Sequence, residues 1–260
     1  MDQGFGICTL SLAPVRAEAS DRSEMISQLL FGDYFQILER SDSWLRICAQ
    51  YDEYEGWVDF KQIVEIEEDL YNKVKSDAVL GLQLTHEATQ LCNNEIIHLL
   101  SGSTLPFYND GIFHLNHKEY TINGSVSSGN PKNFASGIES VARFYLNAPY
   151  LWGGRSPFGI DCSGYTQIVF KQFGICLKRD ARQQALQGNM VGFLQEARAG
   201  DLAFFDNEEG RITHVGIMLN DHEIIHASGR VKIDKIDNQG IFSADLGRYS
   251  HRLRIIKRYI

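Results

Sequence analysis

The stretch GGRSPFGIDCSGYTQIVF, residues 153–170, decides how the second half of this chain is interpreted. Its opening Gly-Gly-Arg-Ser-Pro-Phe-Gly is rich in residues that break regular structure, which predicts an irregular loop. Beyond Cys162, apolar side chains recur at helical spacing. These are Tyr165, Ile168, Val169 and Phe173. The sequence therefore places one thiol where a loop turns into a helix.

A thiol in this position can act as a nucleophile. The N–H groups at a helix N-terminus favour the thiolate, and a nearby imidazole can take the proton. Two histidines downstream lie on predicted strands: His214 in ITHVGIML, where a strand begins, and His226 in EIIHASG, where the next strand ends. Their spacing predicts a hairpin with both rings at neighbouring strand positions. Cys162 and the two histidines thus supply the three parts that a catalytic triad requires.

The N-terminal part of the chain has a different pattern. GICTLSLAPVR and GDYFQILER alternate apolar and polar residues, and SWLRICAQ and EGWVDF follow after polar breaks. Short strands at close spacing predict a small barrel over residues 1–66. Residues 67–125 combine a short helix with further strands, and form either a second barrel or a β extension of the first. A Gly/Ser/Asn/Pro-rich segment at 124–133 predicts a linker.

After this linker helical patterns come first and strand patterns follow, which is the α+β order. The third predicted domain therefore covers residues 126–260.

Composition excludes several classes of partner and cofactor. The chain has 43% hydrophobic and 22% charged residues and a formal net charge of −8, without a Lys/Arg block. Nucleic acid and membranes are therefore not expected partners. The five cysteines are scattered and form no CxxC pair, so neither a disulfide framework nor a zinc site is expected, and no cofactor is implied. Reduced thiols and the absence of a signal-peptide pattern at the start predict a cytoplasmic location.

Four blocks of the C-terminal half carry a resemblance to a known family. DCSGY, ARAGDLAFF, THVGIML and IIHASG, in this order, resemble the NlpC/P60 family of papain-like cysteine peptidases over roughly residues 130–260. The resemblance implies a papain-like α+β fold, with Cys162 as nucleophile, His214 as general base and His226 as the residue that orients the base. The segments PVRAEAS, GDYFQIL, WLRI and EGWVD are similar to a bacterial SH3 domain, so residues 67–125 are a second divergent SH3-like module or a β extension.

The same resemblance implies a substrate. Family members hydrolyse the γ-D-glutamyl bond to a diamino acid in bacterial cell-wall peptides. An SH3-like module before the catalytic domain resembles the dipeptidyl-peptidase subgroup, which requires a free N-terminal L-Ala. The expected activity is release of L-Ala-γ-D-Glu from free muropeptides during recycling. Asp180, in KRDARQQ, matches the carboxylate that anchors the substrate ammonium in that subgroup, but it is equally a helix N-cap facing Gln183 in a capping box.

Further substrate contacts are implied around the nucleophile and in the SH3-like domain. The aromatic residues of YLWGG precede a loop and line the cleft in the subgroup, although packing in the core is the alternative. For the two residues of the N-terminal domain, surface solvation and barrel packing are the alternatives. The implied contacts are Tyr150, Trp152, Asp161, Ser163, Arg179, Glu24 and Tyr54.

Two other functions stay open at this level. The same catalytic core could act as a secreted hydrolase on intact peptidoglycan, or an inert scaffold could only bind cell-wall peptides. Neither the choice between diaminopimelate and lysine nor the oligomeric state is determined by the sequence. The remaining histidines are expected at the surface or hydrogen-bonded locally, and the remaining cysteines in the core. The histidines are His98, His114, His117, His222 and His251, and the cysteines are Cys8, Cys48, Cys92 and Cys176.

Overall fold

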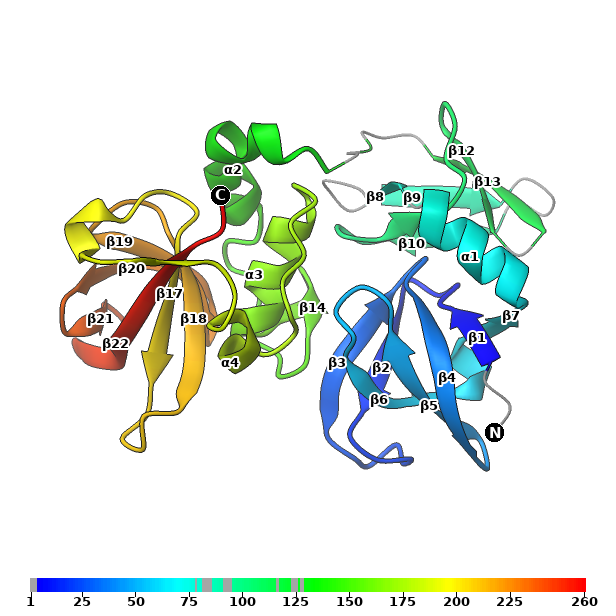
Figure 1. Ribbon diagram of the computed structural model, residues 1–260, viewed down its shortest axis with the longest axis horizontal. Helices are drawn as coiled ribbons and strands as arrows, with labels where there is room; N and C mark the ends of the chain where they lie inside the picture. Colours follow the sequence, from blue (N-terminus) through cyan, green and yellow to red (C-terminus); the bar gives the residue numbers. More distant parts are fainter. Residues whose placement is uncertain are drawn as a thin grey trace. The chain divides into compact units, whose positions relative to one another are not determined.

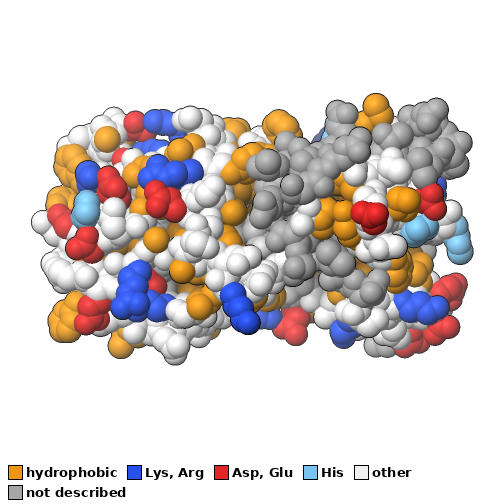
Figure 2. Space-filling view, turned by 90° about the horizontal axis from the view of Figure 1, so that it is seen from above, with side chains coloured by type: hydrophobic (Ala, Val, Ile, Leu, Met, Phe, Trp, Pro, Cys, Tyr) orange, Lys and Arg blue, Asp and Glu red, His pale blue; other side chains and the backbone are white. Residues whose placement is uncertain are grey.

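The computed structural model describes residues 4–77, 79–80, 86–90, 95–115, 117–122, 126 and 129–260 (Figure 1). The chain divides into two compact units, 1–129 and 130–260. Cys92 and residues 124, 125, 127 and 128 of the linker predicted at 124–133 lie outside the described residues. Within the described residues, every helix is too short or too polar to cross a membrane. On the face shown in Figure 2, basic and acidic side chains are interspersed.

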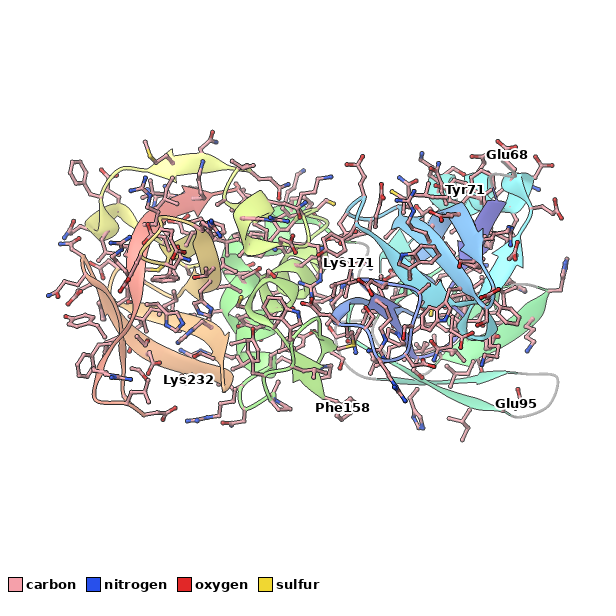
Figure 3. All side chains as sticks on the ribbon, turned by 90° about the horizontal axis from the view of Figure 1, so that it is seen from below. Glu68, Tyr71, Glu95, Phe158, Lys171 and Lys232 are labelled. Carbon is pink, nitrogen blue, oxygen red and sulfur yellow. The ribbon has the colours of Figure 1, made fainter. Side chains whose placement is uncertain are left out.

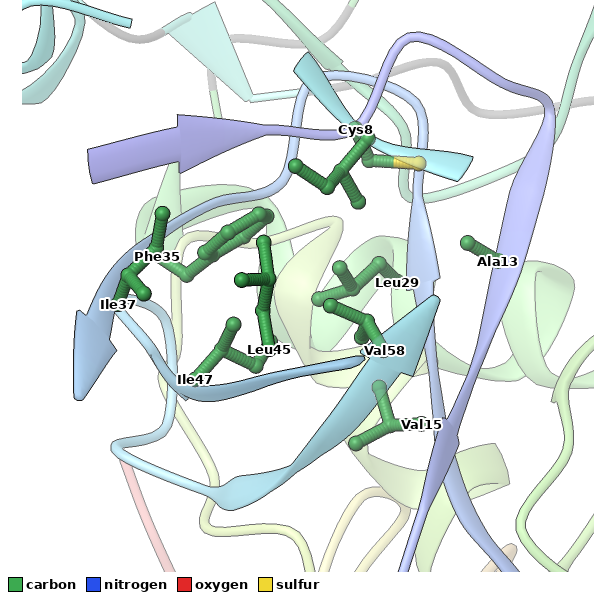
Figure 4. Close-up of a cluster of buried hydrophobic side chains, with 10 residues drawn as sticks. Cys8, Ala13, Val15, Leu29, Phe35, Ile37, Leu45, Ile47 and Val58 are labelled. Atoms are coloured by element: carbon green, nitrogen blue, oxygen red, sulfur yellow. The ribbon is translucent and has the colours of Figure 1, made fainter. Parts of the chain in front are cut away.

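Unit 1 begins with an antiparallel sheet of short strands. In spatial order they are β3 (Met25–Leu30), β2 (Leu12–Arg16), β6 (Glu55–Asp59), β5 (Trp44–Ala49), β4 (Tyr34–Ser41), β1 (Gly4–Ile7) and β7 (Val64–Ile66). Alternate side chains, such as Phe35 and Ile37 on β4, point into one buried cluster with Leu45 and Val58 (Figure 4). The strands are too short to bury a flat face, so they curl around this cluster as a small barrel. The turn η1 (Phe60–Gln62) leads into β7.

The rest of unit 1 adds one helix and a second layer of strands. Helix α1 spans Glu68–Asp77, and a sheet of order β10-β9-β13-β12 follows. A second apolar cluster contains Val74 of α1 and Phe113 and Tyr120 of this sheet, together with Ile7 and Phe31 from the barrel. This part therefore packs on the barrel through a shared core. The strands are β8 (Val79–Leu80), β9 (His86–Gln90), β10 (Ile96–Leu99), β11 (Thr104–Leu105), β12 (Ile112–Leu115) and β13 (Lys118–Ile122).

Unit 2 places its helices before its main sheet. The turn η2 (Pro131–Asn133) precedes α2 (Phe134–Phe144), and the short strands β14 (Arg155–Ser156) and β15 (Gly159–Ile160) form a hairpin before α3 (Cys162–Lys171). Helix α3 is buried along its whole length, since it packs against α2, α4 (Ala181–Gln184), β18 (Ile212–Met218) and β19 (Glu223–Ser228) (Figure 1). A helix covered on all sides holds its first residue in a fixed position.

The main sheet of unit 2 closes on itself. Its strands are β16 (Asn189–Val191), β17 (Leu202–Asp206), β18 (Ile212–Met218), β19 (Glu223–Ser228), β20 (Arg230–Asp237), β21 (Gly240–Ser243) and β22 (Arg248–Arg258), with η3 (Leu194–Glu196) between the first two. The long strand β22 pairs with β16, β17 and β21, so β17 to β22 form a closed ring.

The inside of this ring has an apolar part and a polar part. Met218, Ile224 and Ile236 belong to its apolar core. Because side chains alternate along a strand, residues two positions away share the inward face. On β19 and β20 these positions hold His226 and Asp234, both buried. Polar groups inside a barrel require hydrogen-bond partners, and His226 and Asp234 are partners of each other.

Candidate active site

The loop before the thiol is tied to α3 by Asp161. This residue is the N-cap of α3, and the Gly164 N–H donates to its Oδ1 at 2.6 Å. The Gly153 N–H donates to Oδ2 of the same carboxylate at 2.8 Å. A Cβ on Gly164 would lie 2.4 Å from the Gly154 carbonyl oxygen, so the close approach of loop and helix requires glycine here. The loop lies against the first turn of α3 because the Asp161 carboxylate accepts hydrogen bonds from both.

A buried arginine completes this framework. Arg179 donates to Asp161 through Nη2 at 2.6 Å and Nη1 at 3.1 Å, and to the Ser163 hydroxyl at 3.0 Å. The side chains of Arg179 and Asp161 are 2% and 6% exposed. Their polar atoms are thus engaged with each other and with backbone groups. In this structure Arg179, Asp161 and Ser163 are hydrogen-bonded to one another at the first turn of α3, and their predicted contacts with substrate stay predictions.

Cys162 is the first residue of α3, and its thiol is buried. Burial raises the pKa of Cys162 to about 12, and the charge of Asp161 adds to this, while the N–H groups of Val215 and Ser163 act in the opposite direction. The thiol is therefore neutral in the closed site. Its hydrogen bond with Val215 brings it against β18, directly beside His214 in the chain.

His214 and His226 are brought together as their spacing predicted. His214 Nε2 lies 2.8 Å from His226 Nδ1, and both rings are buried. Gly216 stands opposite His226, where an added Cβ would lie 2.8 Å from the histidine Cβ, so this glycine leaves room for the rings. Burial lowers the pKa of both imidazoles, and for His214 the neighbouring His226 and His251 lower it further. Both rings are therefore neutral at neutral pH.

The hydrogen-bonded chain continues beyond His226 to a residue that the sequence analysis missed. His226 Nε2 lies 3.1 Å from Asp234 Oδ2, and the Lys232 ammonium lies 3.1 Å from the same oxygen. Lys232 projects from β20 in Figure 3. The available signal was the alternation of RVKIDKID, in which Lys232, Asp234 and Ile236 share one face. A lysine and an aspartate at alternate positions are normally read as a solvated face, and this concealed the buried pair.

His251 also belongs to this site, although the sequence placed it at the surface or in a local hydrogen bond. It lies on β22 and stacks on His214, with ring centroids 4.1 Å apart and planes 24° from parallel. Its Nδ1 is 2.8 Å from the Ser250 hydroxyl. Burial, together with His226 and Lys232, lowers the pKa of His251 to about 4. The local hydrogen bond is as expected, and the contact with His214 is set by the closure of the sheet.

Three histidines this close raise the question of a metal. The ligand nitrogens of His214, His226 and His251 lie within 4.8 Å of one another. A metal ion binds an imidazole in the plane of the ring, along the nitrogen lone pair. Because His214 and His251 are stacked in nearly parallel planes, no single point lies at bonding distance in both ring planes. The arrangement suits a hydrogen-bonded chain and would have to turn a ring to bind an ion.

Tyr150, Trp152 and Asp180 are the other predicted substrate residues of unit 2, and their contacts with substrate stay predictions. Burial, and next the electrostatic interactions with Cys162 and Asp161, raise the pKa of Tyr150, which places its phenol near the nucleophile. Trp152 is 58% exposed on the loop that leads to α3. Asp180 precedes α4, where its N–H donates to Gln183 Oε1 at 3.1 Å and its carboxylate lies 3.3 Å from Arg182.

Glu24 and Tyr54 lie in unit 1. Glu24 is exposed in the loop before β3, and Tyr54 is half-buried just before β6. Their predicted contacts with substrate stay predictions.

Comparison with known proteins identifies two domains in the chain. The NlpC/P60 family matches residues 147–247, and the bacterial dipeptidyl-peptidase SH3 domain matches residues 15–63. Gamma-D-glutamyl-L-lysine dipeptidyl-peptidase from Bacillus cereus is 25% identical over 239 residues, which are 80% of this chain and 68% of that protein. Dipeptidyl-peptidase 6 from Lysinibacillus sphaericus is 26% identical over 257 residues, which are 88% of this chain and 90% of that protein. A crystal structure of an NlpC/P60 family protein from Bacillus cereus superposes with a TM-score of 0.82 at 18% identity. The superposition covers 98% of this chain and 99% of that protein.

The chain therefore carries an NlpC/P60 domain preceded by a bacterial SH3 domain. The predicted fold class, a papain-like α+β domain after a small β-barrel, is confirmed. The family match and the named relatives support a peptidase.

Proposed function

We propose that this chain is a cysteine endopeptidase that hydrolyses the γ-D-glutamyl–diamino acid bond of cell-wall peptides with a free N-terminal L-Ala. One observation carries the proposal. Cys162 is the first residue of a buried helix, and its thiol is hydrogen-bonded to Val215. Val215 follows His214 in the chain, and the His214 ring is hydrogen-bonded to His226. A nucleophile, a base and a group that orients the base are the parts required for acyl transfer.

The chemistry follows from which nitrogens are occupied. His214 Nε2 is engaged with His226, so Nδ1 is the nitrogen left to take the thiol proton. The sulfur attacks the γ-carbonyl carbon, and the oxyanion that forms is stabilised by backbone N–H groups at the start of α3. His214 then gives its proton to the departing amine, the C–N bond breaks, and a thioester remains. Water, losing its proton to His214, hydrolyses the thioester and restores the thiol.

The type of substrate is supported by the relatives and by Asp180. Both relatives described above are named dipeptidyl-peptidases, and the name of one includes γ-D-glutamyl-L-lysine. A peptidase that releases a dipeptide benefits from a fixed carboxylate for the substrate amine, because acylated or longer chains leave that charge unpaired. Asp180 lies on the segment between α3 and α4, and α4 packs against β18. We extend the proposal to recycling of free muropeptides in the cytoplasm.

A comparison of two peptides tests the activity and its specificity. The protein is incubated with L-Ala-γ-D-Glu-meso-diaminopimelate and with the N-acetylated peptide, and products are read by mass spectrometry. The L-Lys peptide is run in parallel. Cys162→Ala is expected to abolish turnover. Cys176 was predicted in the core but is exposed, so Cys176→Ala serves as the matched control and is expected to keep turnover.

The outcomes separate the alternatives. Cleavage of the free-amine peptide alone supports the dipeptidyl-peptidase. Equal cleavage of both peptides keeps the peptidase, removes the ammonium anchor and favours a hydrolase of intact peptidoglycan. No cleavage of any peptide by folded protein contradicts the proposal and favours a binding module.

The anchor itself has a separate test, because Asp180 also precedes a helix. Asn is as good an N-cap as Asp, so Asp180→Asn removes the charge and keeps the cap. We expect kcat/KM for the free-amine peptide to fall by about 10- to 150-fold in this variant, which corresponds to the loss of one hydrogen bond to a charged group. Gln183→Ala removes the capping contact and keeps the charge, so it is expected to leave kcat/KM nearly unchanged.

A further inference from the structure

Building on the proposed peptidase activity, we propose that Asp234 is a positioning residue that fixes the protons on both imidazoles and so leaves His214 Nδ1 free to accept the thiol proton. The basis is a continuous buried chain from Asp234 through His226 to His214, with joining distances of 3.1 and 2.8 Å.

The first step concerns the charge of Asp234. Its carboxylate faces three donors: His226, the Lys232 ammonium and the Ala244 N–H, which donates to Oδ1 at 3.1 Å. Burial alone would raise the pKa of Asp234, but these hydrogen bonds outweigh burial and hold the pKa below its usual range. Asp234 is therefore ionised, and an ionised carboxylate only accepts hydrogen bonds.

The second step fixes His226. Since Asp234 can only accept, the hydrogen bond at 3.1 Å requires a proton on His226 Nε2. A neutral imidazole carries one proton, so Nδ1 of His226 holds a lone pair. Burial lowers the pKa of His226 despite the neighbouring carboxylate, which favours this neutral form.

The tautomer of His226 in turn determines which nitrogen of His214 carries a proton. His226 Nδ1 accepts at 2.8 Å from His214 Nε2, which must then carry the proton of His214. The lone pair of His214 is left on Nδ1, where it can take the proton of the Cys162 thiol. In the opposite set of tautomers His214 Nδ1 would carry a proton and could not act as a base. His251 bonds to Ser250 and only stacks on His214, so it leaves the chain of protons intact.

The wild-type protein provides the first test. Long-range 15N–1H correlation spectra of histidine-labelled full-length protein near neutral pH distinguish the two neutral tautomers of each ring. We expect both His214 and His226 as Nε2–H tautomers. A proton on Nδ1 of either ring overturns the proposal. This readout requires no substrate, so it stands or fails separately from the proposed peptidase activity.

The second test replaces Asp234 by Asn. The Asn side chain can place its NH2 group at either of the two positions that the carboxylate oxygens of Asp234 occupy. At the Oδ1 position the NH2 group faces the Ala244 N–H, and at the Oδ2 position it faces the Lys232 ammonium, so it meets another donor in both cases. At the Oδ2 position the nitrogen also donates to His226 and reverses both tautomers. We expect kcat to fall by about 100-fold or more, the usual contribution of a general base, with KM changed by less than about threefold.

A matched control makes the second test specific. Asp237 lies on the same strand, is exposed, and accepts from the Gln239 N–H at 2.8 Å. Asp237→Asn is therefore expected to leave kcat and both tautomers unchanged. The proposal is overturned if Asp234→Asn keeps kcat within about threefold of wild type, or if kcat falls while both rings keep their Nε2 protons. If Asp234→Asn does not fold, the wild-type spectrum decides.

Discussion

Removing the arginine beneath the first turn of α3 is expected to destabilise unit 2 strongly. Arg179→Met takes away a guanidinium that is 2% exposed and leaves Asp161 buried as an unpaired carboxylate. Breaking a buried pair from one side costs about 3–5 kcal/mol. Asp161 still accepts from the Gly153 and Gly164 N–H groups, so the lower end of that range, about 3 kcal/mol, is expected.

The measurement must report on unit 2 alone. Trp44 and Trp57 both lie in unit 1, so tryptophan fluorescence would mix the two units. Hydrogen exchange of the slowest α3 amides, read by mass spectrometry on the full chain, follows the opening of unit 2 itself. A loss of about 3 kcal/mol corresponds to exchange that is faster by a factor of about 100 to 200.

Two variants complete the experiment. Arg143→Met removes an i,i+4 pair with Glu139 whose side chains are 41% and 53% exposed, and it should cost less than about 0.5 kcal/mol. Adding Asp161→Asn to Arg179→Met removes the buried charge and keeps an N-cap, so part of the loss should be recovered. The reasoning is refuted if Arg179→Met is no worse than Arg143→Met, or if the double variant is less stable than Arg179→Met.

Two more predictions concern the same domain. Gly164→Ala should lower the free energy of unfolding by about 1–3 kcal/mol and reduce turnover, because the new Cβ lies 2.4 Å from the Gly154 carbonyl oxygen. Gly192→Ala is the control: its nearest contact is at 3.7 Å, so thermal unfolding should be almost unchanged. The free energy of unfolding should also fall as the pH drops below about 6.5, because the buried His214 and His226 have lowered pKa values and the unfolded chain then binds more protons. His251, whose pKa is lowered to about 4, contributes in the same direction, so the slope in denaturant titrations should approach about 4.1 kcal/mol per pH unit for the three rings. Replacing His226 by Gln should reduce this slope, and a flat profile between about pH 6.5 and 5 would contradict the buried neutral rings.

Several features of the site followed from local sequence alone. The change from breakers to helical spacing at Cys162 predicted the start of α3, and the structure begins the helix at that residue. The spacing of His214 and His226 predicted a hairpin, and β18 and β19 pair in this way. Both predictions depended on neighbours in the chain. Caps, turns and alternation are properties of short segments, so a short segment is enough to reveal them.

Other features could not be found this way. Asp180 shows why: its capping contact with Gln183 is local and was predicted, while the substrate contact proposed for it depends on groups from other segments. The resemblance of KRDARQQ predicts Arg179 as a substrate residue, and only the structure shows that its buried guanidinium is paired with Asp161.

The sequence by itself thus determined the thiol at a helix start, the two histidines of one hairpin and the class of fold. Tertiary structure decided which charged groups are buried with them. Asp234 meets His226 because β20 pairs with β19, and His251 meets His214 because β22 closes the ring of strands. A buried charge is stable only beside its partners, and these partners lie on other strands, so no local pattern of residues could distinguish Asp234 or Arg179 from a charge exposed to solvent.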